Sequence, residues 1–258
     1  LAQQVQGAVL FHHVADAPRV DADRAALGRE RQGVVDEVGH HLGDAALVGL
    51  DGEIVGVVID RKELKQCDFL SYIPSALPYL LIQPKNVVII GARNSIDLWQ
   101  PSYFGASRVS IAEHDASVVK ALESQRESLG PMQIPVFFGS GRNLLRNLPQ
   151  DLGLILLSRT GFFPTGNFGL QEDYDLTVEA ISTYMKQLQG NGILFIQMFL
   201  SPPPRIELRL ARNIKAALKK TGTQEPEKSL LIYRSWDTIN FLVKKDGFSE
   251  ADFSKVSQ

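Results

Sequence analysis

From residue 86 to residue 243, short apolar runs alternate with segments of helical period, and this alternation limits the fold more than any other feature. The run Val87-Val88-Ile89-Ile90 is apolar at every position, as a strand buried on both faces must be. Strands separated by helices pair mainly in parallel. The pattern therefore predicts an α/β fold with a doubly wound, mostly parallel sheet of seven strands.

The predicted elements follow the chain in order. We expect parallel strands at residues 86–91, 108–113, 134–138, 153–157 and 193–200, and a closing antiparallel pair at 230–233 and 238–243. Helices are expected at 96–104, 115–129, 142–148, 172–188 and 204–220, with Gly190 and Gly222 ending the last two. A further helix after residue 66 must be kinked or shortened by Pro74 and Pro78.

The composition changes near residue 60. Residues 1–60 contain no lysine, whereas lysine recurs from Lys62 onward. Short β-type runs at 33–38, 46–50 and 54–59, with Asp51-Gly52 between the last two, indicate a hairpin. We expect a small β-rich N-terminal subdomain at residues 1–65 and the main domain at residues 66–258.

Bulk composition excludes several classes of protein. The apolar fraction of 44% and charged fraction of 22% are those of an ordinary soluble protein, and the net charge of −2 gives no reason to expect nucleic acid or an anionic membrane. The basic residues after Pro204 have the spacing of one solvated helix face, which we favour over a phosphate-binding stripe. A single cysteine, Cys67, suits a reducing compartment, so we expect a cytoplasmic location. The paired histidines at 12–13 and 40–41 lack accompanying ligands, so we expect no metal site.

A nucleotide site is suggested by the ends of the first two strands of the main domain. Gly91 ends the first strand, and Glu113 ends the second 22 residues later. A carboxylate there can accept hydrogen bonds from two ribose hydroxyls, and glycine lets the backbone approach a ligand. Spacing alone is equally consistent with a tight turn at Gly91 and a surface acid at Glu113.

Residues 83–97 and 104–115 resemble the first two cofactor motifs of the spermidine/spermine synthases, a branch of the S-adenosylmethionine-dependent methyltransferase fold. Residues 138–142 resemble the third motif, and residues 50–60 and 74–79 resemble the segments that precede the main domain. The stretches at 172–180, 201–205 and 234–236 are similar to an uncharacterised branch, some of whose members are longer chains with membrane segments. The similarity covers about residues 45–253.

This resemblance implies a Rossmann-like methyltransferase sheet and S-adenosylmethionine or a related adenosyl-sulfur compound as cofactor. The implied cofactor-binding residues are Gly91, Ala92, Arg93, Asp97, Glu113, Ser140, Gly141 and Ser158. The implied substrate pocket contains Tyr79, Asp173 and Tyr174. A homodimer formed partly by residues 33–60 is also implied, with a small-molecule ligand as the other partner. Because the chain begins at Leu1, it fits a fragment of a longer protein whose membrane segment would lie outside it.

The match breaks at residues that carry the chemistry of the synthases. Arg93, Asn94 and Ser95 stand where the family has glycines, and Ser140 stands where it has an acid. After the fourth strand, Ser158 and Arg159 replace the carboxylate that would serve as base and polyamine anchor, so we reject polyamine synthesis.

Three hypotheses remain for the function, and no catalytic residue is assigned. The first is methyl or other group transfer to an unknown acceptor. The second is a non-catalytic scaffold or interaction domain that retains the fold. A nicotinamide-dependent oxidoreductase is the weakest, because the first turn keeps one glycine.

Overall fold

The computed structural model describes residues 46–50, 53–58, 68–92, 95–114, 116–124, 134–159, 174–200, 204–235 and 238–256. The chain forms two compact units, Leu1–Leu47 and Val48–Gln258. The predicted subdomain boundary at residue 65 stays a prediction, because residues 59–67 lie outside the described part.

Two strands near the start of the described chain pair with each other. These are β1 (Ala46–Leu50) and β2 (Glu53–Val58), which together form a two-stranded sheet. This pairing confirms that residues 46–50 and 54–59 were correctly identified as β-type runs. The third predicted run, at residues 33–38, and the turn residues Asp51 and Gly52 lie outside the described residues.

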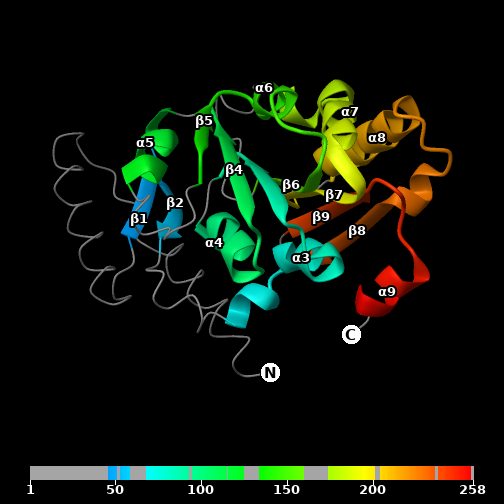
Figure 1. The fold of residues 1–258 in the computed structure, drawn as a ribbon, viewed down its shortest axis with the longest axis horizontal. Coiled ribbons are helices and arrows are strands. Elements are labelled where there is room, and N and C mark those ends of the chain that lie inside the picture. The colour runs from blue at the N-terminus through cyan, green and yellow to red at the C-terminus, as the bar shows by residue number, and fades with distance from the viewer. Residues whose placement is uncertain are drawn as a thin grey trace. The chain divides into compact units, whose positions relative to one another are not determined.

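The second sheet has seven strands, in the order β5-β4-β3-β6-β7-β9-β8 (Figure 1). The strands are β3 (Asn86–Ile90), β4 (Arg108–Glu113), β5 (Val136–Phe138), β6 (Leu152–Arg159), β7 (Leu188–Phe199), β8 (Leu230–Ser235) and β9 (Thr238–Lys244). β3 to β7 run parallel, and β9 runs antiparallel to both β7 and β8. The predicted doubly wound, mostly parallel sheet of seven strands is confirmed.

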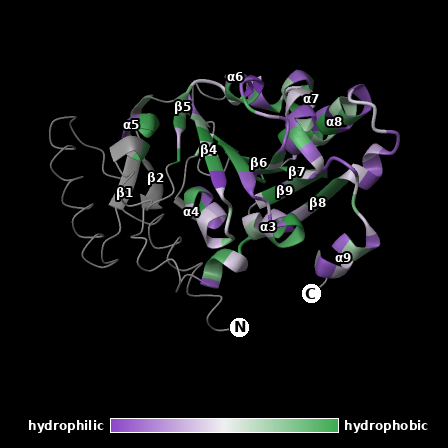
Figure 2. Ribbon diagram, in the orientation of Figure 1, coloured by the Kyte–Doolittle hydropathy of each residue, from purple (hydrophilic) through white to green (hydrophobic). Residues whose placement is uncertain are grey.

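Helices cover both faces of this sheet. α3 (Leu77–Ile82), α4 (Ser95–Tyr103) and α5 (Ala116–Ser124) pack on one face, against side chains that include Ile89, Leu156 and Phe195. α6 (Gly141–Arg146), α7 (Val178–Gln187) and α8 (Arg205–Lys220) pack on the other face. Hydrophobic colour follows the strands, and hydrophilic colour lies on the outer sides of α7 and α8 (Figure 2).

Shorter elements complete the main domain. In the described part of the chain, four 3-10 turns and one helix flank the larger helices, and they are η2 (Asp68–Ser71), η3 (Pro74–Ala76), η5 (Tyr174–Leu176), η6 (Pro226–Ser229) and α9 (Glu250–Val256). The segment after residue 66 is divided into η2, η3 and α3, because prolines occupy the first or second positions of η3 and α3. α9 is tied to α3 by Lys255, whose Nζ donates to the Leu81 carbonyl at 3.2 Å.

One predicted helix boundary was wrong. The helix expected at residues 172–188 begins at Val178, where the Thr177 hydroxyl accepts from the Ala180 N–H at 3.2 Å. It ends at Gln187 because Leu188 is extended and begins β7. Gly190 therefore lies within a strand and does not end the helix.

Candidate functional site

The strand order reverses at β3, which pairs with β4 on one side and with β6 on the other. In open α/β sheets, ligands bind outside the carboxyl ends of the strands at such a switch point. A ligand site is therefore expected at the residues that end β3, β4, β5 and β6, and we call these residues the carboxyl edge.

Gly91 and Glu113 end adjacent strands at this edge. Gly91 has a φ of 73°, a conformation that glycine adopts without strain, and its N–H donates to the Ala112 carbonyl at 2.9 Å. The carboxylate of Glu113 is completely buried, and its Oε1 accepts from the His114 N–H at 2.8 Å. The structure thus gives Glu113 a fixed, buried position, unlike that of an acid exposed at a strand end.

The third motif follows β5. The Ser140 hydroxyl caps α6, accepting from the Asn143 N–H at 3.4 Å. A Cβ at Gly141 would lie 2.5 Å from the Ile90 side chain, so the glycine allows α6 to pack closely on β3. Gly139 donates its N–H to the Glu113 carbonyl at 2.8 Å. Packing and capping therefore explain this motif, and a direct role in binding a cofactor stays a prediction.

Asp97 and Tyr79 were predicted for different roles, and the structure brings them together. Both are buried, on α4 and α3 respectively, and Tyr79 stacks on Phe104 with ring centroids 5.0 Å apart. Burial, and secondarily the charge of Asp97, raises the pKa of Tyr79 well above its ordinary value, so its hydroxyl stays protonated. Among the described residues, that hydroxyl has no hydrogen-bond partner.

A row of buried and half-buried polar side chains continues across the sheet beyond β3. Ser158, Gln197, Asn240 and Tyr233 occupy matching positions on β6, β7, β9 and β8, and we call them the polar row. The Gln197 Nε2 donates to the Asn240 Oδ1 at 2.8 Å, and the Asn240 Nδ2 donates to the Tyr233 carbonyl at 3.4 Å. Alternation along the strands places the row on the face of the sheet that α3 and α4 cover.

Ser158 was predicted from the sequence as a cofactor-binding residue, whereas Gln197 and Asn240 were not predicted for any site. A signal was present, because Gln197 interrupts an otherwise apolar strand, and a buried amide needs a partner of its own kind. Asn240 lies in a strand that is not adjacent in sequence, so only the sheet register reveals the pair.

The remaining predicted residues are placed as follows. Ala92 is buried directly after Gly91, and Tyr174 is 67% exposed in η5. Asp175, the next residue, accepts a hydrogen bond from the Tyr184 hydroxyl at 2.9 Å. Arg93, Asn94 and Asp173 lie outside the described residues, as do the paired histidines.

In the part of the chain that the structure describes, no three His, Cys, Asp or Glu side chains are grouped so that they could hold a metal ion. None of its helices combines the length and the hydropathy needed to cross a bilayer.

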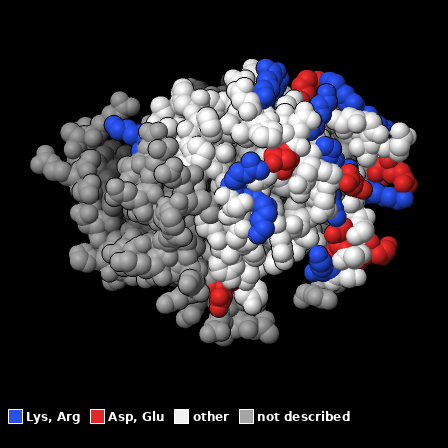
Figure 3. Space-filling view, viewed as in Figure 1, with Lys and Arg blue, Asp and Glu red and all other residues white. Residues whose placement is uncertain are grey.

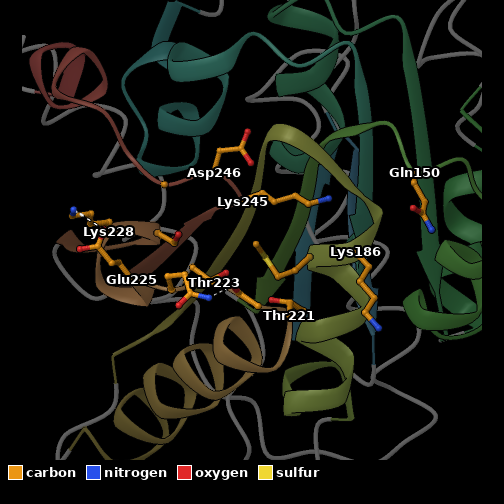
Figure 4. A pocket seen from close by; sticks show the side chains of 13 residues that line it. Gln150, Lys186, Thr221, Thr223, Glu225, Lys228, Lys245 and Asp246 are labelled. Atoms are coloured by element: carbon orange, nitrogen blue, oxygen red, sulfur yellow. Dashed lines mark hydrogen bonds and ion pairs between the residues drawn. The ribbon is translucent and has the colours of Figure 1, made fainter.

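A hollow of about 660 Å³ lies at the opposite, amino edge of the sheet (Figure 4). It is lined by the ends of α7 and α8, by η6 and by the turn after β9. Lys228 pairs with Glu225 at 2.7 Å, and Lys245 donates to the Leu188 carbonyl. Because helix C-termini favour cations, the lysines here are explained by their surroundings and do not indicate an anionic ligand.

Comparison with solved structures identifies the fold. A probable spermidine synthase from Corynebacterium glutamicum ATCC 13032 superposes with a TM-score of 0.58 and 12% identity, over 83% of this chain and 77% of that one. A spermidine synthase from Thermotoga maritima gives 0.52 and 15%, over 80% of this chain and 67% of that one. Human methyltransferase-like protein 13 in complex with SAH gives 0.51 and 13%, over 70% and 82% of the two chains.

The chain has the fold of the spermidine synthases and the S-adenosylmethionine-dependent methyltransferases. No family model and no curated protein matches the sequence. The fold class and the resemblance predicted from residues 83–142 are thereby confirmed at the level of structure.

Proposed function

We propose that this chain binds S-adenosylmethionine or a related adenosyl-sulfur compound at the carboxyl edge and transfers a methyl or other group from it. The observation that carries the proposal is the complete burial of the Glu113 carboxylate at the end of β4, one strand from the glycine turn at Gly91. A carboxylate held at the end of the second strand, beside the switch point, is placed where it can accept hydrogen bonds from both hydroxyls of a nucleotide ribose.

The described residues fit such a ligand in two respects. Glu113 would accept from the ribose hydroxyls, and its orientation is already set by the His114 N–H. Gly91 has a positive φ and no side chain, so its backbone can be approached closely by a ligand at the end of β3. When bound, the sulfonium of the cofactor supplies a carbon that a nucleophile can attack.

The polar row supports an acceptor that is not a polyamine. Its members Ser158, Gln197, Asn240 and Tyr233 are all uncharged, and a polycation needs carboxylates to offset its loss of hydration. Burial raises the pKa of Tyr233 above its ordinary value, so this phenol does not become an anion near neutral pH either. We infer an acceptor that is neutral or carries little charge.

Calorimetric titration tests the proposal. The ligands are S-adenosylmethionine, its decarboxylated form, methylthioadenosine and NAD, each added to the purified chain. We expect the adenosyl-sulfur compounds to bind and NAD not to bind. Binding of NAD alone would favour an oxidoreductase. Failure of every adenosyl ligand would favour a scaffold that retains the fold without the cofactor.

A further inference from the structure

α8 carries a continuous row of cations along its exposed side. Arg205, Arg209, Arg212, Lys219 and Lys220 are all exposed. At 100° per residue they lie within an arc of about 100°, over a length of about 22 Å. The helix contains one acid, Glu207, which is turned inward and is 2% exposed. We call these five side chains the α8 stripe.

The C-terminal half of the stripe is explained by the fold. Lys220 pairs with Glu179 of α7 at 3.2 Å, and the neighbouring Lys215 pairs with Glu227. Lys219 and Lys220 also lie in the last turn, where the partial negative charge of the helix end favours cations. These lysines therefore require no external partner.

The N-terminal half of the stripe is not explained in this way. In the described part of the chain, Arg205, Arg209 and Arg212 form no ion pair or hydrogen bond. Arg205 is the first residue of the helix, where the partial positive charge of the helix end disfavours a cation. Three unpaired guanidinium groups at spacings of four and three residues form a line of bidentate anion donors.

The net charge of −2 is a sum over the whole chain and does not show the local excess of Lys and Arg on α8. Residues 1–60 carry ten Asp and Glu against four Arg, so the rest of the chain carries 19 acids against 23 Lys and Arg. In Figure 3, Lys and Arg lie along the upper part of the described surface, with Asp and Glu among them. The spacing of these residues favoured a solvated helix face, and the net charge favoured no nucleic acid partner, whereas the unpaired arginines support the phosphate-binding alternative.

We propose that the α8 stripe binds the phosphodiester backbone of a nucleic acid strand. A regular line of anions matches a straight line of arginines, and guanidinium binds phosphate, as it binds carboxylate, in two-point geometry. The exposed apolar residues of the helix, Ile206 and Leu208, lie on either flank of the arginines and not among them, so the central contact is ionic. α8 also begins just after the carboxyl end of β7, so a strand held along it would end near the candidate site.

Fluorescence anisotropy with a labelled oligouridylate tests the proposal without any adenosyl ligand. We expect binding at low salt that weakens as salt rises. The variant Arg205→Gln/Arg209→Gln/Arg212→Gln should lose tenfold or more in affinity at about 0.1 M salt, and its slope of log K against log[salt] should fall by about 2. The control variant Lys85→Gln/Lys120→Gln/Lys255→Gln removes the same charge away from α8 and should bind nearly as the natural chain does.

Three results would overturn the assignment. The first is the absence of oligonucleotide binding at low salt. The second is an equal loss of oligonucleotide affinity in the two triple variants. The third is binding of poly-L-glutamate that is equally tight and depends on the same arginines, which would assign the stripe to an acidic polypeptide. Circular dichroism of both variants verifies that the fold is retained. Because no cofactor is added, failure here leaves the calorimetric test of cofactor binding independent.

Discussion

At the scale of the residue, Tyr79 and Tyr233 differ in what their hydroxyl groups contact. The Tyr233 hydroxyl donates to the Pro74 carbonyl, whereas that of Tyr79 has no partner among the described residues. Burial raises the pKa of both, so both remain protonated near neutral pH. The two side chains therefore provide a matched pair for measuring what one buried hydrogen bond contributes.

Tyr233→Phe should lower the free energy of unfolding by about 1 kcal/mol, because it removes a hydrogen bond and leaves the carbonyl unpaired. Tyr79→Phe should leave the free energy of unfolding unchanged or raise it, because an unpartnered hydroxyl costs desolvation. Urea denaturation of the two variants beside the natural chain measures both values. An equal loss of stability in both would show that the Tyr79 hydroxyl has a partner after all.

Residues 93–95 lead to a prediction about ligand preference. Arg93, Asn94 and Ser95 add side chains where the resemblance implies that the cofactor's amino-acid tail would lie. Methylthioadenosine lacks this tail and should therefore bind at least as tightly as S-adenosylmethionine. Competition titration measures the order, and Arg93→Gly/Asn94→Gly/Ser95→Gly should shift it toward S-adenosylmethionine. A natural chain that already prefers S-adenosylmethionine would disprove the occlusion.

At the scale of the element, α9 is anchored by a buried ion pair. The Lys244 Nζ lies 2.6 Å from the Asp252 Oδ2, with 8% and 9% of the two side chains exposed. Burial alone would raise the pKa of Asp252, but hydrogen bonds from Lys244 and Ser249 outweigh it and hold the pKa below its ordinary value. The pair therefore links the stability of this end of the chain to pH.

The pKa of Asp252 is lower in the folded state than in the unfolded state. Its contribution to the free energy of unfolding is therefore complete above the unfolded pKa of about 3.9 and is lost as pH falls through the folded pKa. Asp252→Asn should cost about 3 kcal/mol at pH 7 and flatten the acid side of the stability curve. Urea unfolding at a series of pH values measures both effects. Lys244→Met/Asp252→Leu should recover most of the loss, since it leaves no unpaired charge.

The elements could be predicted where burial on two faces makes a strand apolar throughout. β3 and β6 were located to within two residues because a strand that is buried on both faces is apolar at nearly every position. The start of α7 was placed too early because Glu172, Asp173 and Asp175 suggest a helix N-terminus as strongly as Thr177 does. Only the observed cap at Thr177 decides between them.

The candidate site was predictable where one strand end defines it, as at Gly91 and Glu113. The pair Gln197 and Asn240 was not, because two antiparallel strands 43 residues apart in sequence must pair in a fixed register before these amides meet. Likewise, no sequence spacing shows that Tyr79 lies near Asp97. The periodicity of a segment shows which of its residues are buried. It does not show which residues of a distant segment they will contact.

At the scale of the whole molecule, the N-terminal region is expected to form a dimer. The resemblance implies that residues 33–60 contribute to the interface, and the apolar strand faces at 46–50 and 54–59 need a partner. Multi-angle light scattering should give about twice the mass of 28.5 kDa. A monomer at high concentration would disprove the dimer, while leaving the fold and the cofactor proposal unaffected.

The most direct measurement of cofactor binding concerns Glu113. Glu113→Gln should weaken the binding of methylthioadenosine and S-adenosylmethionine by about 1.5 to 3 kcal/mol, or roughly 10- to 150-fold, as expected for hydrogen bonds to a charged group. Glu179→Gln, a change of the same kind at an exposed position of α7, should leave both dissociation constants unchanged. Isothermal titration of the three proteins compares them directly. A dissociation constant for Glu113→Gln equal to that of the natural chain would contradict the assignment of Glu113 to the ribose, and with it the proposed cofactor site.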